Sequence, residues 1–133
     1  MGWLFCFLSS KVSSIKMERL RTYNIEGDVS ELENIINSNA RIFTTLRDVL
    51  SVLTKDKTNY IMVGYGESLT DAYNDALVEE RVCRLVHIFY SDWSYADISK
   101  LNEFIGSMDK DIIFGCSMDK KLERSIKLVM LCQ

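Results

Sequence analysis

Few residues of this sequence have types and spacing that could do chemistry, and the first of them is a histidine. His87 is the one histidine of the chain and stands in the middle of the apolar segment CRLVHIFY, residues 83–90. A catalytic histidine usually lies at a strand end or in a loop, within reach of a nucleophile and an orienting acid. We therefore favour a packed or partner-facing histidine over a catalytic one.

A glycine-containing turn, Gly64-Tyr65-Gly66, follows a predicted strand and precedes a predicted helix, as a nucleotide-binding turn would. That fingerprint requires a third glycine where this chain has Leu69, and the carboxylate of Glu67 would repel a phosphate. A tight strand-to-helix turn explains the two glycines better. A rival hypothesis stays open, in which a small-molecule-binding or enzymatic α/β domain uses a cleft near these glycines and His87.

The thiols form no recognisable metal site. The four cysteines, at positions 6, 83, 116 and 132, include no C-x-x-C pair. A structural zinc site normally needs clustered thiolate or imidazole ligands, so we expect no metal and no cofactor. Three of the cysteines lie in apolar runs and are interpreted as small buried side chains. Free thiols fit a reducing cytoplasm, although their pairing in space stays open.

The segment Asp92-Trp93-Ser94-Tyr95 places two aromatic side chains in a predicted loop. Tryptophan and tyrosine are enriched among the residues that anchor protein interfaces. Trp93 fits equally well as a cover over the hydrophobic core, and the sequence does not decide between these roles. No Walker-type loop, H-E-x-x-H or G-x-S-x-G motif occurs anywhere in the chain.

The composition is that of a folded domain. The chain has 133 residues, of which 47% are hydrophobic and 26% charged, a net charge of −3 and no proline. This length buries one core, and these values exclude a disordered, collagen-like or disulfide-stapled chain. The small negative charge gives no broad basic surface for nucleic acid or an anionic membrane.

The N-terminal segment differs from the rest. Residues 3–8 form an apolar run of six residues, far short of the ~20 that a transmembrane helix needs. No basic segment precedes the run, as a signal peptide would require. We expect residues 1–27 to be a leader or helix remnant, with Met17 as an alternative start, and residues 28–133 to form a single domain without a membrane span.

From residue 28 onward the sequence alternates between helical and strand patterns. Helices are expected after a cap at Asp28 or Ser30, after Thr45, from Thr70, and after a Ser94–Asp97 capping box, with Gly106 ending the last one. Strands are expected at residues 40–44, 59–63, 83–90, 112–114 and 126–131. Strands that alternate with helices predict an α/β domain with a mixed four- to five-stranded sheet and one or two helical layers.

Four segments stand in an order and at a spacing that are not generic. They are FTTLRDVLSVL at 43–53, MVGYGESLTDAYNDAL at 62–77, RLVHIFYSDWSYADISKLNEFI at 84–105 and DIIFGCSMDKKLERSIKLVMLC at 111–132. They resemble, in this order, NVDFADVKTVM, MMGTGEA, VLINITGG and the pair NIIFGA and IRVTVIATG of the tubulin/FtsZ family, in and just before the C-terminal domain of the cell-division protein FtsZ. The last match is the most specific, and the likeness covers roughly residues 40–132.

The resemblance implies an FtsZ C-terminal-like domain, an α+β two-layer sandwich, that does not bind or hydrolyse GTP by itself. In the family a separate domain holds GTP with the loop GGGTGTG, which this chain lacks. A loop of the C-terminal domain places two acids against the nucleotide of the next subunit. The later acid is kept as Asp48, the earlier one falls on Thr45, and the family's asparagine falls on Phe43. We therefore expect no enzyme.

The expected partner is FtsZ, another tubulin-like protein, or a second copy of this chain. The residues assigned to that interface are Thr45, Arg47, Asp48, Asp92, Trp93 and Tyr95. Such a protein would be cytoplasmic, would act in cell division, and could cap a filament. A truncated or split FtsZ that needs a separate GTPase half, a small-molecule-binding domain, and a subunit that associates through an exposed sheet edge remain as alternatives.

Overall fold

The computed structural model describes residues 18–77, 79–108 and 110–133. Its centre is a mixed sheet of six strands in the order β1-β3-β6-β4-β5-β2. The strands are β1 (Ile25–Glu26), β2 (Asn39–Ile42), β3 (Asn59–Gly66), β4 (Cys83–Tyr90), β5 (Ile113–Met118) and β6 (Ile126–Cys132). Only β1 with β3 and β4 with β5 run parallel, and every other neighbouring pair is antiparallel. The predicted mixed sheet is confirmed, with one strand more than expected because the short β1 adds an edge.

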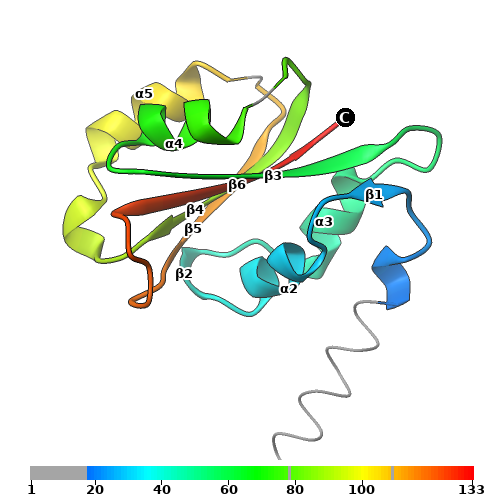
Figure 1. Ribbon diagram of the computed structural model, residues 1–133, viewed down its shortest axis with the longest axis horizontal. Helices are drawn as coiled ribbons and strands as arrows, with labels where there is room; N and C mark the ends of the chain where they lie inside the picture. The colour runs from blue at the N-terminus through cyan, green and yellow to red at the C-terminus, as the bar shows by residue number, and fades with distance from the viewer. Residues whose placement is uncertain (1–17, 78, 109) are drawn as a thin grey trace, which may run out of the picture.

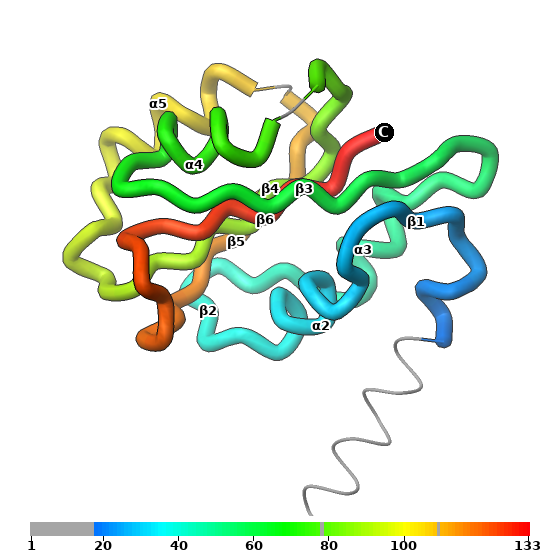
Figure 2. The backbone as a smooth tube through the Cα atoms, viewed as in Figure 1, coloured from blue at the N-terminus to red at the C-terminus, as the bar shows by residue number. Residues whose placement is uncertain are grey.

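Helices cover both faces of this sheet. The elements are α2 (Ser30–Ile36), α3 (Leu46–Val52), α4 (Leu69–Ala76), α5 (Ile98–Gly106) and a single 3-10 turn, η1 (Trp93–Tyr95). Figure 1 shows α4 and α5 on one side of the strands and α2 and α3 on the other, and the tube in Figure 2 shows the same arrangement. The sequence left one or two helical layers open, and the structure has two, with the sheet between them.

The strand β4 has its apolar side chains on both faces, as its unbroken apolar sequence predicts. Val86 and Ile88 pack in the apolar cluster under α4 and α5. Leu85 and Phe89 pack in the cluster under α2 and α3. Every residue of β4 from 85 to 90 is buried. The sheet therefore divides the hydrophobic core into two halves.

Three expected helix ends are wrong, and one is confirmed. The N-cap of α2 is Val29, which makes no side-chain capping hydrogen bond, rather than the expected Asp28 or Ser30. Asp97, whose side chain accepts a hydrogen bond from the Lys100 N–H, caps α5 alone, while Ser94 lies inside η1. Gly106 is the last residue of α5 and has no positive φ, so it does not act as the glycine cap. Thr45 caps α3 as predicted.

Part of the segment before residue 28 belongs to this fold. Leu20 is buried and lies in the same apolar cluster as Leu32 of α2. Ile25 and Glu26 pair with β3 as strand β1. The apolar run at residues 3–8 lies outside the described residues. Within the described part of the chain, no helix is long and apolar enough to cross a membrane.

Candidate protein-binding surface

The first residues of α3 hold two of the predicted interface residues in a structural role. The Thr45 backbone N–H and hydroxyl both donate to Asp48 Oδ2, over 2.9 and 3.0 Å. The Asp48 N–H donates back to Thr45 Oγ1 over 3.2 Å, which completes a reciprocal capping box. The sequence signal was present as T-x-x-D. Both side chains are thus explained by helix capping before any partner is considered.

The neighbouring side chains have no such role. Arg47 is exposed and makes no hydrogen bond or ion pair with any described residue. Phe43, just before the cap, leaves 68% of its surface exposed, which is unusual for an aromatic side chain. This pair, a free guanidinium and an uncovered ring, is what the start of α3 offers to another molecule.

Arg41 connects this region to the second predicted interface segment. Its guanidinium lies 4.3 Å from the centre of the Trp93 ring, a cation–π contact between β2 and η1. Arg41 also precedes Thr45 by only four positions, so one short segment of the chain connects the contact with η1 to the start of α3. Sequence analysis did not identify Arg41, because the contact joins residues that are 52 positions apart (93 − 41) in the chain.

The η1 segment resolves the open question about Trp93. The ring is half-buried against the core, 6.1 Å from the Tyr90 ring, and carries Arg41 on its other side. It therefore covers the core and also contributes to the surface. Asp92 is fixed by a 2.9 Å hydrogen bond from the Ser94 N–H, and this bond lowers the pKa of its carboxyl group.

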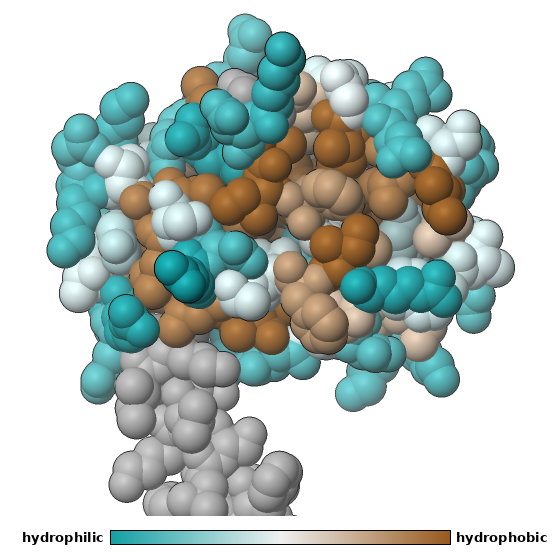
Figure 3. All heavy atoms as spheres, turned by 180° about the vertical axis from the view of Figure 1, so that it is seen from behind, coloured by the Kyte–Doolittle hydropathy of each residue, from teal (hydrophilic) through white to brown (hydrophobic). Residues whose placement is uncertain are grey.

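Exposed apolar side chains border the same stretch. Tyr95 leaves 51% of its surface exposed and Ile98, at the start of α5, leaves 74%. In the space-filling view of the back of the molecule, apolar side chains gather in the middle of the face with polar side chains around them (Figure 3). The exposure of Ile98 was not predictable from the sequence, because an isoleucine in the first turn of an amphipathic helix is usually a core residue.

His87 is packed inside the molecule, as the sequence favours. Its side chain is completely buried on the α2 and α3 side of the sheet. Its Nδ1 lies 2.9 Å from Thr44 Oγ1 and its Nε2 lies 2.6 Å from Ser117 Oγ. Ser117 continues the chain of hydrogen bonds to the hydroxyl of Ser38. Burial lowers the pKa of His87 from 6.5 to about 4, so the ring is neutral at physiological pH.

The two glycines and His87 do not line a common cleft, as the small-molecule hypothesis requires. A Cβ atom on Gly64 would lie 2.0 Å from the Ala72 carbonyl oxygen, and one on Gly66 would lie 2.6 Å from the Ala72 nitrogen. Both glycines therefore lie against α4, on the face opposite His87. Their function is to let the helix approach the strand, and no nucleotide-binding turn is formed.

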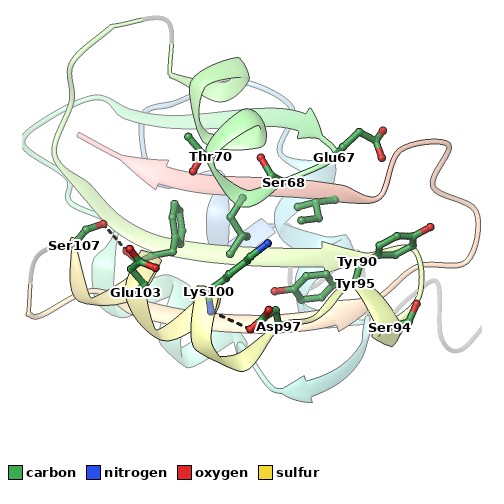
Figure 4. A pocket seen from close by; sticks show the side chains of 13 residues that line it. Glu67, Ser68, Thr70, Tyr90, Ser94, Tyr95, Asp97, Lys100, Glu103 and Ser107 are labelled. Atoms are coloured by element: carbon green, nitrogen blue, oxygen red, sulfur yellow. Dashed lines mark hydrogen bonds between the residues drawn. The ribbon is translucent and has the colours of Figure 1, made fainter.

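A cavity of about 670 Å³ opens instead between α4 and α5. Figure 4 shows its lining side chains, with Lys100 and Glu103 on α5 facing Ser68 and Thr70 at the start of α4. Tyr90 lines the cavity with a buried hydroxyl group that has no hydrogen-bond partner among the described residues. Burial, together with the nearby Cys116 and Asp97, raises the pKa of Tyr90 to about 12.

The described cysteines are unpaired with one another by disulfides, and they do not cluster with other metal-ligating residues. Cys83, Cys116 and Cys132 are free thiols. No group of three or more His, Cys, Asp or Glu side chains converges as a metal site within the described ranges.

The fold has counterparts among solved structures. No family model and no curated protein matches the sequence. A tryptophan-to-tyrosine mutant of FtsZ from M. jannaschii is similar, with a TM-score of 0.55, 20% identity, and coverage of 79% of this chain and 36% of that one. An empty FtsZ dimer from M. jannaschii is also similar, with a TM-score of 0.57, 20% identity, and coverage of 78% and 35%. This chain thus shares the fold of part of FtsZ and spans little more than a third of those chains.

Proposed function

We propose that this chain is a non-catalytic, FtsZ C-terminal-domain-like protein that binds FtsZ or another tubulin-like filament and caps it during cell division in the cytoplasm. The observation that carries the proposal is the exposed pair Phe43 and Arg47, which flanks the Thr45 cap. The resemblance assigns this segment to the loop that meets the next subunit in FtsZ. An exposed aromatic ring and an unpaired guanidinium are the side-chain types that most often anchor protein interfaces.

The same segment supports a role without catalysis. Thr45 has no carboxylate, and its hydroxyl donates to Asp48 within the capping box. A chain that docks on the nucleotide face of an FtsZ subunit would therefore supply one acid where the family supplies two, and that acid is engaged in capping. The bound GTP would remain unhydrolysed, and the filament end would persist.

Sedimentation of FtsZ polymers tests this proposal. FtsZ with GTP is mixed with an excess of the chain, and both polymer mass and GTP turnover are followed. We expect turnover to fall several-fold with the natural chain and to recover with Arg47→Ala. Arg84→Ala is the matched control, since Arg84 is also an exposed arginine but lies on strand β4, whereas Arg47 lies in helix α3. Unchanged polymer mass and turnover at excess protein would reject the proposal.

A split FtsZ is the related alternative. In that case the chain would form a complex with a separately produced GTPase domain that carries GGGTGTG, and the complex would hydrolyse GTP. A reading frame encoding that loop next to this one would favour the alternative. Restored hydrolysis on mixing the two parts would replace the capping role with a shared active site.

Self-association is a further alternative with structural support. The strand β2 covers β5 only at residues 116–118, so Ile113 and Phe114 have no outer strand partner in the described part of the chain. Uncovered edges of this kind pair with other strands. Sedimentation equilibrium of the chain alone distinguishes this alternative, because it requires a dimer in the absence of FtsZ.

The cavity supports a second candidate function, a small-molecule site. A buried Tyr90 hydroxyl group without a partner is costly, and a ligand that accepts its hydrogen bond would remove that cost. The volume of about 670 Å³ lies in the range of natural ligand sites. A fragment screen by NMR tests this role: binding that perturbs the cavity residues and weakens in Tyr90→Phe would support it, and no binding would reject it.

A further inference from the structure

The pairing of β4 with β6 brings two cysteines together. Cys83 on β4 is paired with Cys132 on β6 in the antiparallel register, and the register shifts between Cys83 and Leu85, on the side away from Val82. Next to them, Val82 and Gln133 exchange both of their backbone hydrogen bonds, over 3.3 and 2.9 Å. Antiparallel ladders alternate between hydrogen-bonded and non-hydrogen-bonded pairs, so Cys83 and Cys132 form a non-hydrogen-bonded pair. Such pairs have the closer side chains, with Cα atoms about 4.5 Å apart, inside the range that a disulfide spans.

The two thiols are neighbours, and one of them is accessible. The Cys83 thiol donates a hydrogen bond to the Leu85 carbonyl oxygen over 3.5 Å, and both cysteines lie in the apolar cluster under α4 and α5. Cys132 is completely buried, whereas Cys83 is half-buried and lines a cavity of about 450 Å³ between α4 and α5. A small oxidant can therefore reach Cys83 first. Cys116, the third described cysteine, is buried on a different strand, β5, and is not opposite either of them.

The electrostatics differ between the two thiols. The neighbouring Cys83 thiol and the positive charge of Arg81 lower the pKa of Cys132, against the effect of burial. The neighbouring Cys132 thiol, together with burial, raises the pKa of Cys83. Cys132 is thus the more acidic thiol of the pair and lies behind Cys83, which faces the cavity.

We propose that Cys83 and Cys132 form a redox-active dithiol, which a small disulfide oxidant such as oxidised glutathione converts into a cross-strand disulfide. In the first step the sulfur of Cys83, after losing its proton to solvent, attacks one sulfur of the oxidant and expels one glutathione as a thiolate. In the second step Cys132 also loses its proton to solvent, and its sulfur attacks the Cys83 sulfur of this mixed disulfide and expels the second glutathione as a thiolate. The dithiol loses two electrons and two protons, and both glutathione molecules leave as thiols.

The test counts thiols by mass spectrometry in the full-length chain with Cys6→Ser, which leaves the three described cysteines. The folded protein is equilibrated with reduced and oxidised glutathione, quenched with acid, unfolded and alkylated. We expect two thiols to disappear together as the buffer becomes more oxidising, with Cys116 alone alkylated and a peptide linking residues 83 and 132. The oxidised form should melt roughly 5–10 °C higher, because the bond closes a long loop of the chain.

Two variants distinguish a specific disulfide between Cys83 and Cys132 from non-specific oxidation of the thiols. Cys116→Ser should form the same disulfide. Cys132→Ser should stop at the mixed disulfide, with glutathione retained on Cys83. Three alkylated thiols in every buffer, or a linked peptide that contains Cys116, would overturn the proposal. The mapping needs no substitution at either proposed cysteine, so its result stands even if a variant at Cys132 fails to fold.

Discussion

At the start of α3 some residues stabilise the helix, and their neighbours are exposed and available for binding. Thr45 and Asp48 satisfy each other's backbone N–H groups, whereas Arg47 between them makes no hydrogen bond or ion pair with any residue that the structure describes. Since helix capping already explains Thr45 and Asp48, these two side chains give little evidence for binding. Arg47 and Phe43 are therefore the residues on which the binding proposal depends.

This division predicts opposite outcomes for two substitutions. Thr45→Ala removes the acceptor of the Asp48 N–H and should lower the free energy of unfolding by about 1 kcal/mol. Arg47→Ala should leave that free energy unchanged and weaken binding to FtsZ. Urea denaturation and a binding titration on both variants measure the two effects. A large loss of stability in Arg47→Ala would show that its side chain has an unrecognised structural role.

His87 makes stability depend on pH. The unfolded chain binds a proton with the ordinary pKa of 6.5, while the folded chain does so only near 4. Between these values the unfolded state holds the proton that the folded state excludes, so the stability is complete above pH 6.5 and is lost as the pH falls toward 4. We expect the free energy of unfolding to fall by about 2 kcal/mol from pH 7.5 to pH 5.

His87→Gln is the control for that measurement. Glutamine retains a donor and an acceptor toward Thr44 and Ser117 but does not titrate. Its stability should be nearly constant over the same pH range, which lies above the titration of ordinary carboxylates. An equal pH dependence in this variant would mean that other groups carry the effect.

At the scale of elements, α4 lies so close to β3 that glycine is required between them. A Cβ atom on Gly64 would lie 2.0 Å from the Ala72 carbonyl oxygen and 2.4 Å from the Ala76 nitrogen, both backbone atoms that cannot move alone. Gly64→Ala should therefore displace the helix and lower the free energy of unfolding by about 3 kcal/mol. Thermal or urea unfolding measures the loss.

Gly106 provides the matched comparison. A Cβ atom there would meet nothing within 4 Å, and the residue lies in α5 with an ordinary φ. Gly106→Ala should raise the free energy of unfolding by about 0.5–1 kcal/mol, because alanine loses less conformational entropy in a helix. Destabilisation by both substitutions would show that the close approach at Gly64 is not the cause.

The sequence was sufficient for elements with a strong local signal. The strand β4 is predicted with its exact limits, because a mostly apolar segment of eight residues indicates a strand covered on both faces, and residues 85–90 are in fact buried. The end of α5 was not predictable in the same way. Ser94 and Asp97 have the right spacing for a capping box, but Ser94 is already used by η1, which a pattern of two residues does not reveal.

At the scale of the whole molecule, the sequence could not say which residues meet. His87 on β4 and Gly64 on β3 lie in a single sheet but on its opposite faces. Alternate residues of a strand point to opposite faces of the sheet. Which face a given residue shares with residues of other strands is known only once the register of all strands is known. The same register produces the contact between Arg41 and Trp93 and the pairing of Cys83 with Cys132, neither of which local patterns contain.

The FtsZ-like fold was predicted from four short segments and is now shown by the architecture itself. Identity to the similar FtsZ structures is only 20%, so this likeness reports a shared fold and leaves the activity to experiment. The support for the binding surface lies in the exposure of Phe43 and Arg47 in this chain.

The most direct measurement is capture of purified full-length FtsZ from the same cell by the immobilised chain, with and without GTP. The account predicts GTP-dependent capture that is lost in Arg47→Ala and kept in Arg84→Ala. Circular dichroism first shows that each variant is folded. Equal capture without GTP or by Arg47→Ala, or no capture by the folded natural chain, would contradict the account.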